Sequence, residues 1–353
     1  MQLMKIKKLL AVTLAGILAV STAACSREPA LTRYDAQFLQ LFDTITSMVG
    51  YAKDKETFTA YAQELHDELE VYHQLYDIYH EYEGINNLKT INDNAGIEPV
   101  VVDGKIIDML EFAKELNART NGYFNVAMGS VLSIWHEYRT AGIDDPMTAE
   151  LPPMEALEEA GKHMDINDVI IDKEASTVYL ADADMSLDVG AIAKGYATEM
   201  VCRKLEEDGL TKALVSVGGN VRAIGTKDDG SKWKLGIQNP DLASDTKFLH
   251  MIAVADMSLV TSGDYQRYYT VDGVQYHHIV NPDTLMPWFE YDSVSILCKD
   301  SGMADALSTA VFNMKQEDGQ ALIESLDGVE AMWLYPDGSE KYSSGFQAYM
   351  EDE

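Results

Sequence analysis

Residues 188–197 mix small side chains with an acidic and a basic one, a combination that could bind a phosphate. Glycine and alanine let a ligand approach the backbone closely, and the stretch leads into a predicted helix. The N-terminus of a helix offers unpaired N–H groups and a positive dipole end to an anion, and Lys194 would add a positive charge. The spacing matches neither a P-loop nor the GxGxxG fingerprint, so tight packing of the helix is an equally good interpretation.

A second stretch, residues 304–310, places a carboxylate and a hydroxyl in a predicted apolar helix. Asp305 and Thr309 stand at positions i and i+4, so their side chains share one face. These are hard oxygen ligands, which suit a Mg²⁺ ion that also keeps water and substrate phosphate ligands. Alternatively, Asp305 caps the helix or is an acidic residue of its first turn.

Two further stretches could face the same ligand. Gly218 and Gly219 follow a short predicted strand, where they permit either close approach to a ligand or simply a tight turn. Residues 261–282 contain two aromatic runs around an Asp-Gly pair, the strongest short signal for a hairpin. This hairpin presents candidate polar groups at Ser262, Asp264, Arg267 and His278.

Histidine is the natural general base near neutral pH, and the hairpin holds two in succession. Side chains of adjacent strand residues point to opposite faces. At most one of His277 and His278 is therefore expected to meet a substrate.

Predicted helices and strands that must position these groups alternate along the chain without a repeat or an internal linker. Residues 56–82 show apolar and aromatic residues at helical spacing, and this face, Tyr79 included, is interpreted as a packing surface. Residues 38–51 are predicted to form one strand, and residues 86–96 a polar loop. The pattern predicts an α+β fold: one large domain with a mixed, mostly antiparallel sheet and packed helices. The other predicted helices lie within 104–120, 129–138, 146–164, 188–205, 303–315 and 319–326, and the other strands within 169–180, 213–217, 233–238, 248–255, 291–298 and 329–335.

The N-terminus has the features of a targeting segment. A basic start at residues 5–8 precedes an apolar stretch, residues 9–20, that is too short to span a bilayer. Small residues then lead to Cys25, a pattern similar to a bacterial lipoprotein signal in which the cysteine is lipidated. Secretion with cleavage nearby is the alternative.

These features predict three segments: a lipoprotein signal peptide at 1–24, a lipidated tether at 25–36 and a catalytic domain at 37–353. The predicted location is extracytoplasmic, with a lipid anchor holding the domain to the bacterial cell membrane. Cys202 and Cys298 remain; they could pair in an exported protein, but each lies in an apolar run, which favours buried free thiols.

The composition limits the partners. The formal net charge is -31, which argues against nucleic acid, because phosphate contacts need clustered Lys and Arg. A hydrophobic content of 46% is sufficient for a large core.

The motifs together resemble those of the ApbE family, the FAD:protein FMN transferases, in the same order and over nearly the whole mature chain. The resemblance implies an enzyme that splits the diphosphate of FAD, releases AMP and joins FMN by a phosphoester to a Thr or Ser of a target protein. It also implies a requirement for Mg²⁺. The matching stretches are residues 42–44, residues 122–129 with Trp135, residues 188–197, residues 216–220 with residues 261–284, and residues 304–310.

The same resemblance implies roles for particular residues. The metal ligands fall on Asp305, Thr309 and the backbone carbonyl of Ala191, and the catalytic histidine falls on His278. With the candidates above, the expected FAD-binding residues are Asn92, Phe124, Asn125, Asp188, Lys194, Gly218, Gly219, Ser262, Asp264, Arg267 and Ile279.

The acceptor implied by the resemblance is a flavoprotein of a membrane or extracytoplasmic redox system. Two other functions remain open at this point. One is a Mg²⁺-dependent FAD pyrophosphatase that gives FMN and AMP, with water in place of the acceptor hydroxyl. The other is a non-enzymatic FAD-binding lipoprotein, which would not need Asp305, Thr309 and His278 together.

Overall fold

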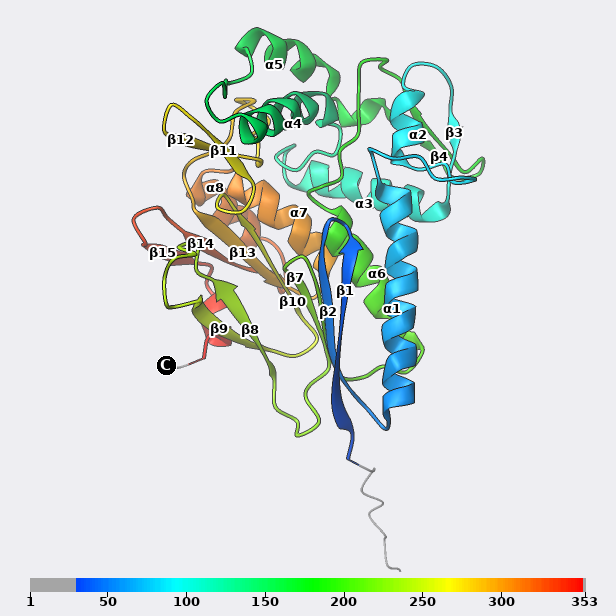
Figure 1. Cartoon of the computed structure of the whole chain (residues 1–353), viewed down its shortest axis with the longest axis vertical. Helices are drawn as coiled ribbons and strands as arrows, with labels where there is room; N and C mark the ends of the chain where they lie inside the picture. Colours follow the sequence, from blue (N-terminus) through cyan, green and yellow to red (C-terminus); the bar gives the residue numbers. More distant parts are fainter. Residues whose placement is uncertain (1–29, 352–353) are drawn as a thin grey trace, which may run out of the picture. The chain divides into compact units, whose positions relative to one another are not determined.

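An eight-stranded antiparallel sheet is the central element of the computed structural model, which describes residues 30–351. The expected signal peptide, Cys25 and most of the expected tether lie outside this range. Every pairing within the sheet is antiparallel, so the predicted α+β class with a mostly antiparallel sheet is confirmed. The strand order is β1 (Thr32–Leu41), β2 (Thr44–Ala52), β6 (Ala213–Val217), β7 (Asn220–Ile224), β10 (Ser258–Gly263), β13 (Ser293–Cys298), β14 (Glu330–Leu334) and β15 (Glu340–Tyr342) (Figure 1).

Three smaller antiparallel sheets accompany the large one. The hairpin of β11 (Tyr268–Val271) and β12 (Val274–His277) forms as predicted around the Asp-Gly turn. It packs on α4 (Gly129–Asp144), where Tyr269 and Val271 join a cluster with Trp135. The remaining strands are β3 (Val100–Val101), β5 (Thr177–Leu180) and β4 (Val169–Asp172) in one sheet, and β8 (Trp233–Gln238) with β9 (Phe248–Val254) in the other.

Helices α1 and α6 pack together, and α1 also lies along β1 and β2 (Figure 1). No helix among residues 30–351 combines the length and the apolarity needed to cross a membrane. Cys202 and Cys298 are free and buried, as predicted. The other helices are α2 (Leu88–Asp93), α3 (Gly104–Arg119), α5 (Met154–Ala160), α7 (Ser301–Phe312) and α8 (Gln316–Glu324), with α1 at Lys55–Tyr76 and α6 at Ala193–Glu207.

The predicted strand over residues 38–51 is wrong, because the chain reverses within it. Phe42 and Asp43 both adopt φ of 52° and form a tight turn between β1 and β2. Such left-handed turns match the twist of paired strands and normally use Gly or Asn, neither of which is present here. β1 also begins at Thr32, inside the range expected as a tether, because its residues pair with β2 along its length.

The predicted helix over residues 56–82 is too long, and α1 ends at Tyr76. Asp77 ends it by accepting hydrogen bonds from the backbone N–H groups of Tyr79 (2.6 Å) and His80 (3.0 Å). The expected polar loop over residues 86–96 contains the short helix α2, which starts at a capping box formed by Asn87 and Thr90. Both differences arise from side-chain caps rather than from hydrophobic periodicity.

Helices α6 and α7 approach each other closely at Gly195. A Cβ atom there would lie 2.3 Å from the backbone oxygen of Ser301 and 2.4 Å from the Cβ of Asp305. Real Cβ atoms are not found at such distances, so only glycine permits this contact. The close approach places Asp305 of α7 against the first turn of α6.

Candidate active site

A cavity of about 940 Å³ collects most of the residues that the sequence analysis selected. Its volume is near the upper end of the range for small-molecule sites, as a dinucleotide would require. The β1–β2 turn, the segment after α1, helix α4, residues 186–194, the end of β10 and the inner face of α7 form its wall. The predicted residues that line it are Asn92, Asn125, Asp188, Ala191, Lys194, Gly218, Ser262, Arg267, His278, Ile279, Asp305 and Thr309.

The segment before α6 presents an uncapped helix N-terminus to this cavity. Asp188 accepts a hydrogen bond from the N–H of Gly190 (2.8 Å), and no side chain caps the helix at Ile192. Lys194 Nζ donates to the carbonyl oxygen of Gly190 (3.3 Å) and so bends back over this turn. Burial raises the pKa of Asp188, while the Gly190 N–H and the charges of Arg139 and Lys194 oppose the rise. The N–H groups of Ile192 and Ala193 already donate to the Val189 carbonyl, so this end of the helix offers its positive dipole and the Lys194 ammonium group to an anion.

Asp305 is a buried carboxylate, only 5% exposed, on the cavity wall. Its Oδ2 accepts a hydrogen bond from the N–H of Gly195 (2.8 Å) and lies 3.9 Å from Lys194 Nζ. Burial raises its pKa, and Lys194 and Gly195 partly oppose this shift. Asp300 is the N-cap of α7 and accepts from the N–H of Met303 (2.8 Å), so Asp305 is not the cap that the sequence left as an alternative.

Thr309 lies one turn after Asp305 on the same helix and also lines the cavity. Its Oγ1 is 3.4 Å from the Oγ of Ser262, which in turn is 2.8 Å from the Oγ of Ser308. Strand β10 thus supplies a hydroxyl that orients the helix hydroxyls. Ser262 is placed to support Thr309 and also to contact a ligand.

The two histidines at the end of β12, His277 within the strand and His278 after it, have different surroundings. His277 is 3% exposed, its Nε2 lies 2.9 Å from the Trp288 carbonyl, and its Nδ1 accepts from the N–H of Ile279 (3.2 Å). His278 lines the cavity, and its Nδ1 lies 3.3 Å from the carbonyl oxygen of Arg267. A carbonyl only accepts, so Nδ1 of His278 carries the proton and Nε2 keeps its lone pair.

Electrostatics keep His278 neutral. Desolvation lowers its pKa to about 3, and the positive charge of Arg267 contributes in the same direction. The side chain is only half-buried by surface exposure, so the cavity wall around it, and not complete enclosure, causes the desolvation. A neutral imidazole with a free nitrogen is the form that can accept a proton from a substrate.

Two predicted contacts, Asn92 and Asn125, line the cavity but use their amides on the backbone. Asn92 Nδ2 donates to the Leu187 carbonyl (3.0 Å), and its Oδ1 accepts from the Leu187 N–H (2.8 Å). Asn125 Nδ2 donates to the Met164 carbonyl (2.9 Å), and its Oδ1 accepts from the N–H of Ala127 (2.9 Å). Both residues therefore shape the wall, and Asn92 fixes the chain immediately before Asp188.

Three of the predicted contacts do not reach the cavity wall. Phe124 is 1% exposed and packs in the main core, where burial of its aromatic ring is favourable. Gly219 completes the two-residue turn between β6 and β7 with φ of 94°. Asp264 lies beside Asp292, and burial with this neighbour raises its pKa to about 6. None of the three residues is part of the cavity wall, and their expected contact with FAD stays a prediction.

Several cavity residues were not selected from the sequence. Tyr79 was interpreted as part of a packing face, but it follows the end of α1, is 55% exposed and lines the cavity. Its ring lies 5.5 Å from that of His136, whose Nδ1 accepts a hydrogen bond from Arg139 (3.0 Å). Asn220, beside the selected glycines, also lines the cavity. An Asp-initiated turn at Asp77 is the one signal that could have separated Tyr79 from the helix.

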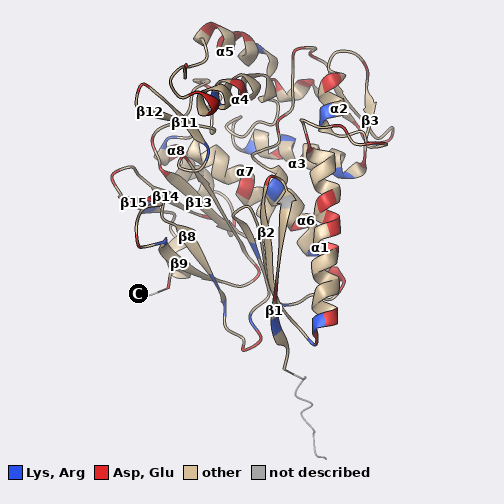
Figure 2. Cartoon of the chain, in the orientation of Figure 1, with Lys and Arg blue, Asp and Glu red and all other residues tan. Residues whose placement is uncertain are grey.

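Charged side chains of both signs line the cavity. Acidic side chains are spread over α1, α4 and α5 (Figure 2), as expected from a formal net charge of -31. The acidic side chains of the cavity wall are Asp43, Asp77, Glu137, Asp188 and Asp305. Lys194, Arg139 and Arg267 also line the cavity, and these are the groups that can attract an anionic ligand.

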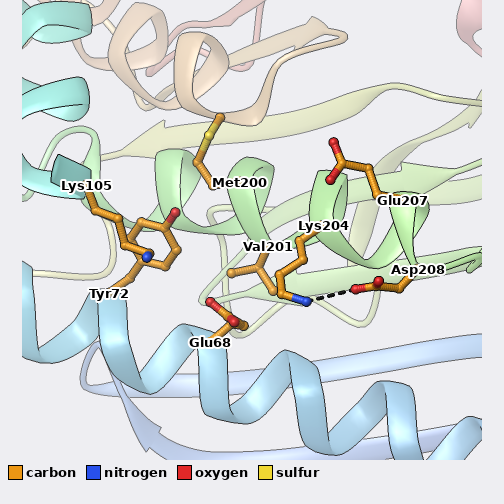
Figure 3. A pocket seen from close by; sticks show the side chains of 8 residues that line it. All are labelled: Glu68, Tyr72, Lys105, Met200, Val201, Lys204, Glu207 and Asp208. Atoms are coloured by element: carbon orange, nitrogen blue, oxygen red, sulfur yellow. Dashed lines mark hydrogen bonds and ion pairs between the residues drawn. The ribbon is translucent and has the colours of Figure 1, made fainter.

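A smaller cavity of about 400 Å³ lies between α1 and α6 (Figure 3). Lys204 crosses it and pairs with Glu64 and Asp208, and Lys105 Nζ lies 5.8 Å from the ring of Tyr72. Lys204 is thus neutralised by its two carboxylate partners, while Glu68 and Glu207 add further acidic groups to the lining. The predicted catalytic and metal-binding residues line the larger cavity.

A family model described as the ApbE family matches residues 42–333, which is most of the chain. The chain belongs to the ApbE family. The Treponema pallidum protein named FAD:protein FMN transferase is 37% identical to this ApbE-family chain over 272 residues, 73% of each chain. The Haemophilus influenzae protein of the same name is 27% identical over 326 residues, 90% of each chain.

Solved structures of the ApbE family have the same fold. The Thermotoga maritima ApbE protein superposes with a TM-score of 0.78 at 28% identity, covering 91% of this chain and all of that one. The flavin transferase ApbE from Vibrio cholerae superposes with a TM-score of 0.74 at 24% identity, covering 90% of this chain and 100% of that one, and supports the fold alone.

Proposed function

We propose that this ApbE-family chain is a Mg²⁺-dependent FAD:protein FMN transferase. It would cleave FAD, attach FMN by a phosphoester to a Thr or Ser of a target flavoprotein and release AMP. The observation that carries the proposal is the meeting, in one cavity, of a neutral His278 with a free Nε2, the buried Asp305 and Lys194 at the start of α6. The relatives are named FAD:protein FMN transferase, and this name indicates the reaction that these residues would catalyse.

The chain's own groups would bind the diphosphate of FAD at the start of α6. The positive dipole end of the helix and Lys194 would attract the diphosphate there, and Arg139 and Arg267 add positive charge elsewhere on the wall. Tyr79 offers an exposed aromatic face for a flavin or adenine ring. Positioning and electrostatics are the main sources of acceleration in phosphoryl transfer.

Asp305, Thr309 and the carbonyl oxygen of Ala191 would hold the Mg²⁺ ion. The fit rests on the donor set, which consists of hard oxygens, and on Asp305, a buried carboxylate whose nearest positive group, Lys194 Nζ, is 3.9 Å away. When bound, Mg²⁺ would neutralise charge on the diphosphate oxygens. Ser262 would keep the hydroxyl of Thr309 oriented.

His278 would act as the general base. Its Nε2 would take the proton of the acceptor hydroxyl while the hydroxyl oxygen forms a bond to the phosphorus of the FMN half. The bond from that phosphorus to the bridging oxygen would break, and AMP would leave with that oxygen. The carbonyl of Arg267 keeps Nδ1–H in place during the transfer.

The acceptor would be a flavoprotein of a membrane or extracytoplasmic redox system. Lipidation of Cys25 would hold the enzyme on the outer side of the bacterial cell membrane, where such an acceptor is reached. Metabolic labelling with a fatty-acid analogue, comparing the native chain with Cys25→Ser, tests this part. Label in both proteins would contradict it.

The central test is incubation of the protein with FAD, Mg²⁺ and a candidate acceptor, followed by flavin fluorescence of the denatured acceptor in a gel. The expected result is a fluorescent acceptor band and one AMP per flavin attached. Free FMN and AMP without a labelled acceptor would show a pyrophosphatase instead. FAD that stays intact and bound would show a binding protein and would contradict catalysis.

A further inference from the structure

Asn220 has a buried amide nitrogen that makes no hydrogen bond within residues 30–351. The residue is 3% exposed, and its Nδ2 lacks a partner. Buried polar atoms in folded proteins are nearly always hydrogen-bonded, so an unpaired donor calls for an explanation. Asn220 also lines the large cavity, so a ligand could supply the missing partner.

Few other groups share this combination. Among the described residues, the buried side-chain atoms without a partner are those of Thr46, Asn220, Trp288, Ser301, Asn313 and Trp333. Only Asn220 and Asn313 of this set line the cavity, and the unpaired atom of Asn313 is its Oδ1, an acceptor. The Nδ2 of Asn220 is thus the unpaired donor that an anionic ligand could use.

The backbone holds Asn220 in a fixed place. It is the first residue of β7 and pairs with Val217 across the turn formed by Gly218 and Gly219. A Cβ at Gly218 would lie 2.7 Å from the Oγ1 of Thr44, so the turn packs tightly on the β1–β2 turn. The side chain then lies near Asp305, whose pKa it helps to lower, without a hydrogen bond of normal geometry to the carboxylate.

We propose that Asn220 is a further catalytic residue, whose Nδ2 donates a hydrogen bond to an oxygen of the FAD diphosphate. The inference rests on the proposed function, since it concerns the same substrate. Asp305 and Lys194, whose charged groups lie 3.9 Å apart, line the same cavity as Asn220. A donor fixed before the reaction starts stabilises the negative charge that develops on the phosphate oxygens, and Asn220 neither gains nor loses a proton.

The first measurement is FAD binding in EDTA, followed by fluorescence quenching, with the wild-type protein, Asn220→Ala and the isosteric Asn220→Asp. Without the donor, FAD affinity should fall about tenfold, and the Asp variant should be weaker still because its carboxylate repels phosphate. Riboflavin, which has no phosphate, should bind all three proteins equally. The absence of metal separates a phosphate contact from an effect on the metal site.

The matched control is Thr46→Val, which removes a buried, equally unpaired hydroxyl that does not line the cavity. This variant should bind FAD and transfer flavin like the wild type. Single-turnover transfer at saturating FAD and Mg²⁺ should fall about 100-fold in Asn220→Ala.

Unchanged FAD affinity in EDTA, with only a higher Mg²⁺ requirement, would overturn the proposal and make Asn220 a positioning residue for Asp305. A wild-type protein that binds FAD but never labels an acceptor would contradict the proposed function, not this contact. Folded variants, checked by thermal unfolding, that bind FAD and riboflavin like the wild type would contradict the contact alone.

Discussion

Asp305 places a buried carboxylate on an otherwise apolar helix. The helix gains no stability from this group, because one N–H and an ammonium group 3.9 Å away offset its desolvation only in part. A buried carboxylate that lowers stability and has a raised pKa is typical of a functional site, where its charge is needed.

Replacing Asp305 with Asn should therefore separate folding from activity. The isosteric amide removes the buried charge, so the free energy of unfolding should stay the same or rise. Mg²⁺-dependent flavin transfer should fall roughly 100-fold or more, because the charged metal ligand is lost. Thermal unfolding and the gel assay measure the two effects, with Asp300→Asn as a control that keeps the cavity wall unchanged. Full transfer by the Asp305 variant would refute the metal assignment.

His278 allows a prediction about pH. Its pKa in the folded protein is about 3, well below the usual value of about 6.5, so the neutral base persists as the pH falls. The rate of transfer should show no loss from protonation of His278 between about pH 8 and pH 5. An ionisation near pH 6.5 that disappears in His278→Gln would contradict the prediction.

The same shift has a consequence for stability with a definite sign. Below about pH 6.5 the unfolded chain binds a proton at His278 that the folded chain does not, so this residue lowers stability progressively as pH falls. His278→Gln should reduce that loss at about pH 5 and have little effect on it at about pH 8, as measured by denaturant unfolding.

At the scale of elements, the site depends on the contact between α6 and α7. Gly195 of α6 lies against Ser301 and Asp305 of α7 with no space for a methyl group. The helix end that would bind phosphate and the carboxylate that would bind metal are thus held in one arrangement. Neither can shift without the other.

Replacing Gly195 with Ala should push the two helices apart. The clash is with backbone as well as side chain, so the free energy of unfolding should fall by about 1–3 kcal/mol, and metal-dependent transfer should fall even in the folded fraction. Gly104→Ala is the matched control, since nothing lies within 4 Å of its added Cβ. That control should leave stability unchanged or raise it by up to about 1 kcal/mol. Equal behaviour of the two variants would contradict the argument.

The elements with regular hydrophobic periodicity were predictable, and those set by local caps were not. Helix α3 and the β4–β5 hairpin fall where the pattern places them. The turn at Phe42 and Asp43 contains no Gly or Asn, so Asp43 alone is a weak local signal for it. The end of α1 is set by the hydrogen bonds of Asp77, which periodicity does not register. Tyr79 was therefore assigned to packing although it lines the cavity.

The residues of the candidate site fall into two similar groups: those that a local sequence motif reveals, and those that only the tertiary structure reveals. Lys194 and Asp305 lie in distinctive motifs and are predictable because their types suit phosphate and metal chemistry, and His278 suits proton transfer. Asp188 is predicted from the family resemblance. Arg139 reaches the same cavity from α4, but nothing in its own helix distinguishes it from a solvent-exposed arginine. Contacts between distant parts of the chain, which only the tertiary structure brings together, could not be read from spacing.

At the scale of the molecule, one cavity joins widely separated parts of the chain. Segments from the first hairpin to α7 contribute to its wall, so residues far apart in sequence depend on the same sheet for their positions. The chain is strongly acidic, and both acidic and basic side chains line this cavity. Its basic side chains, Lys194, Arg139 and Arg267, are those that would attract an anionic substrate.

The two buried cysteines can report the unfolding of two different parts of the hydrophobic core. Cys202 belongs to the core around α1 and α6, and Cys298 to the core around α7 and β14. Burial raises the pKa of both thiols, so neither should react with a maleimide until its own core is exposed. In chains with Cys25→Ser and one further cysteine removed, the two labelling rates would tell whether the cores separate together or one after the other.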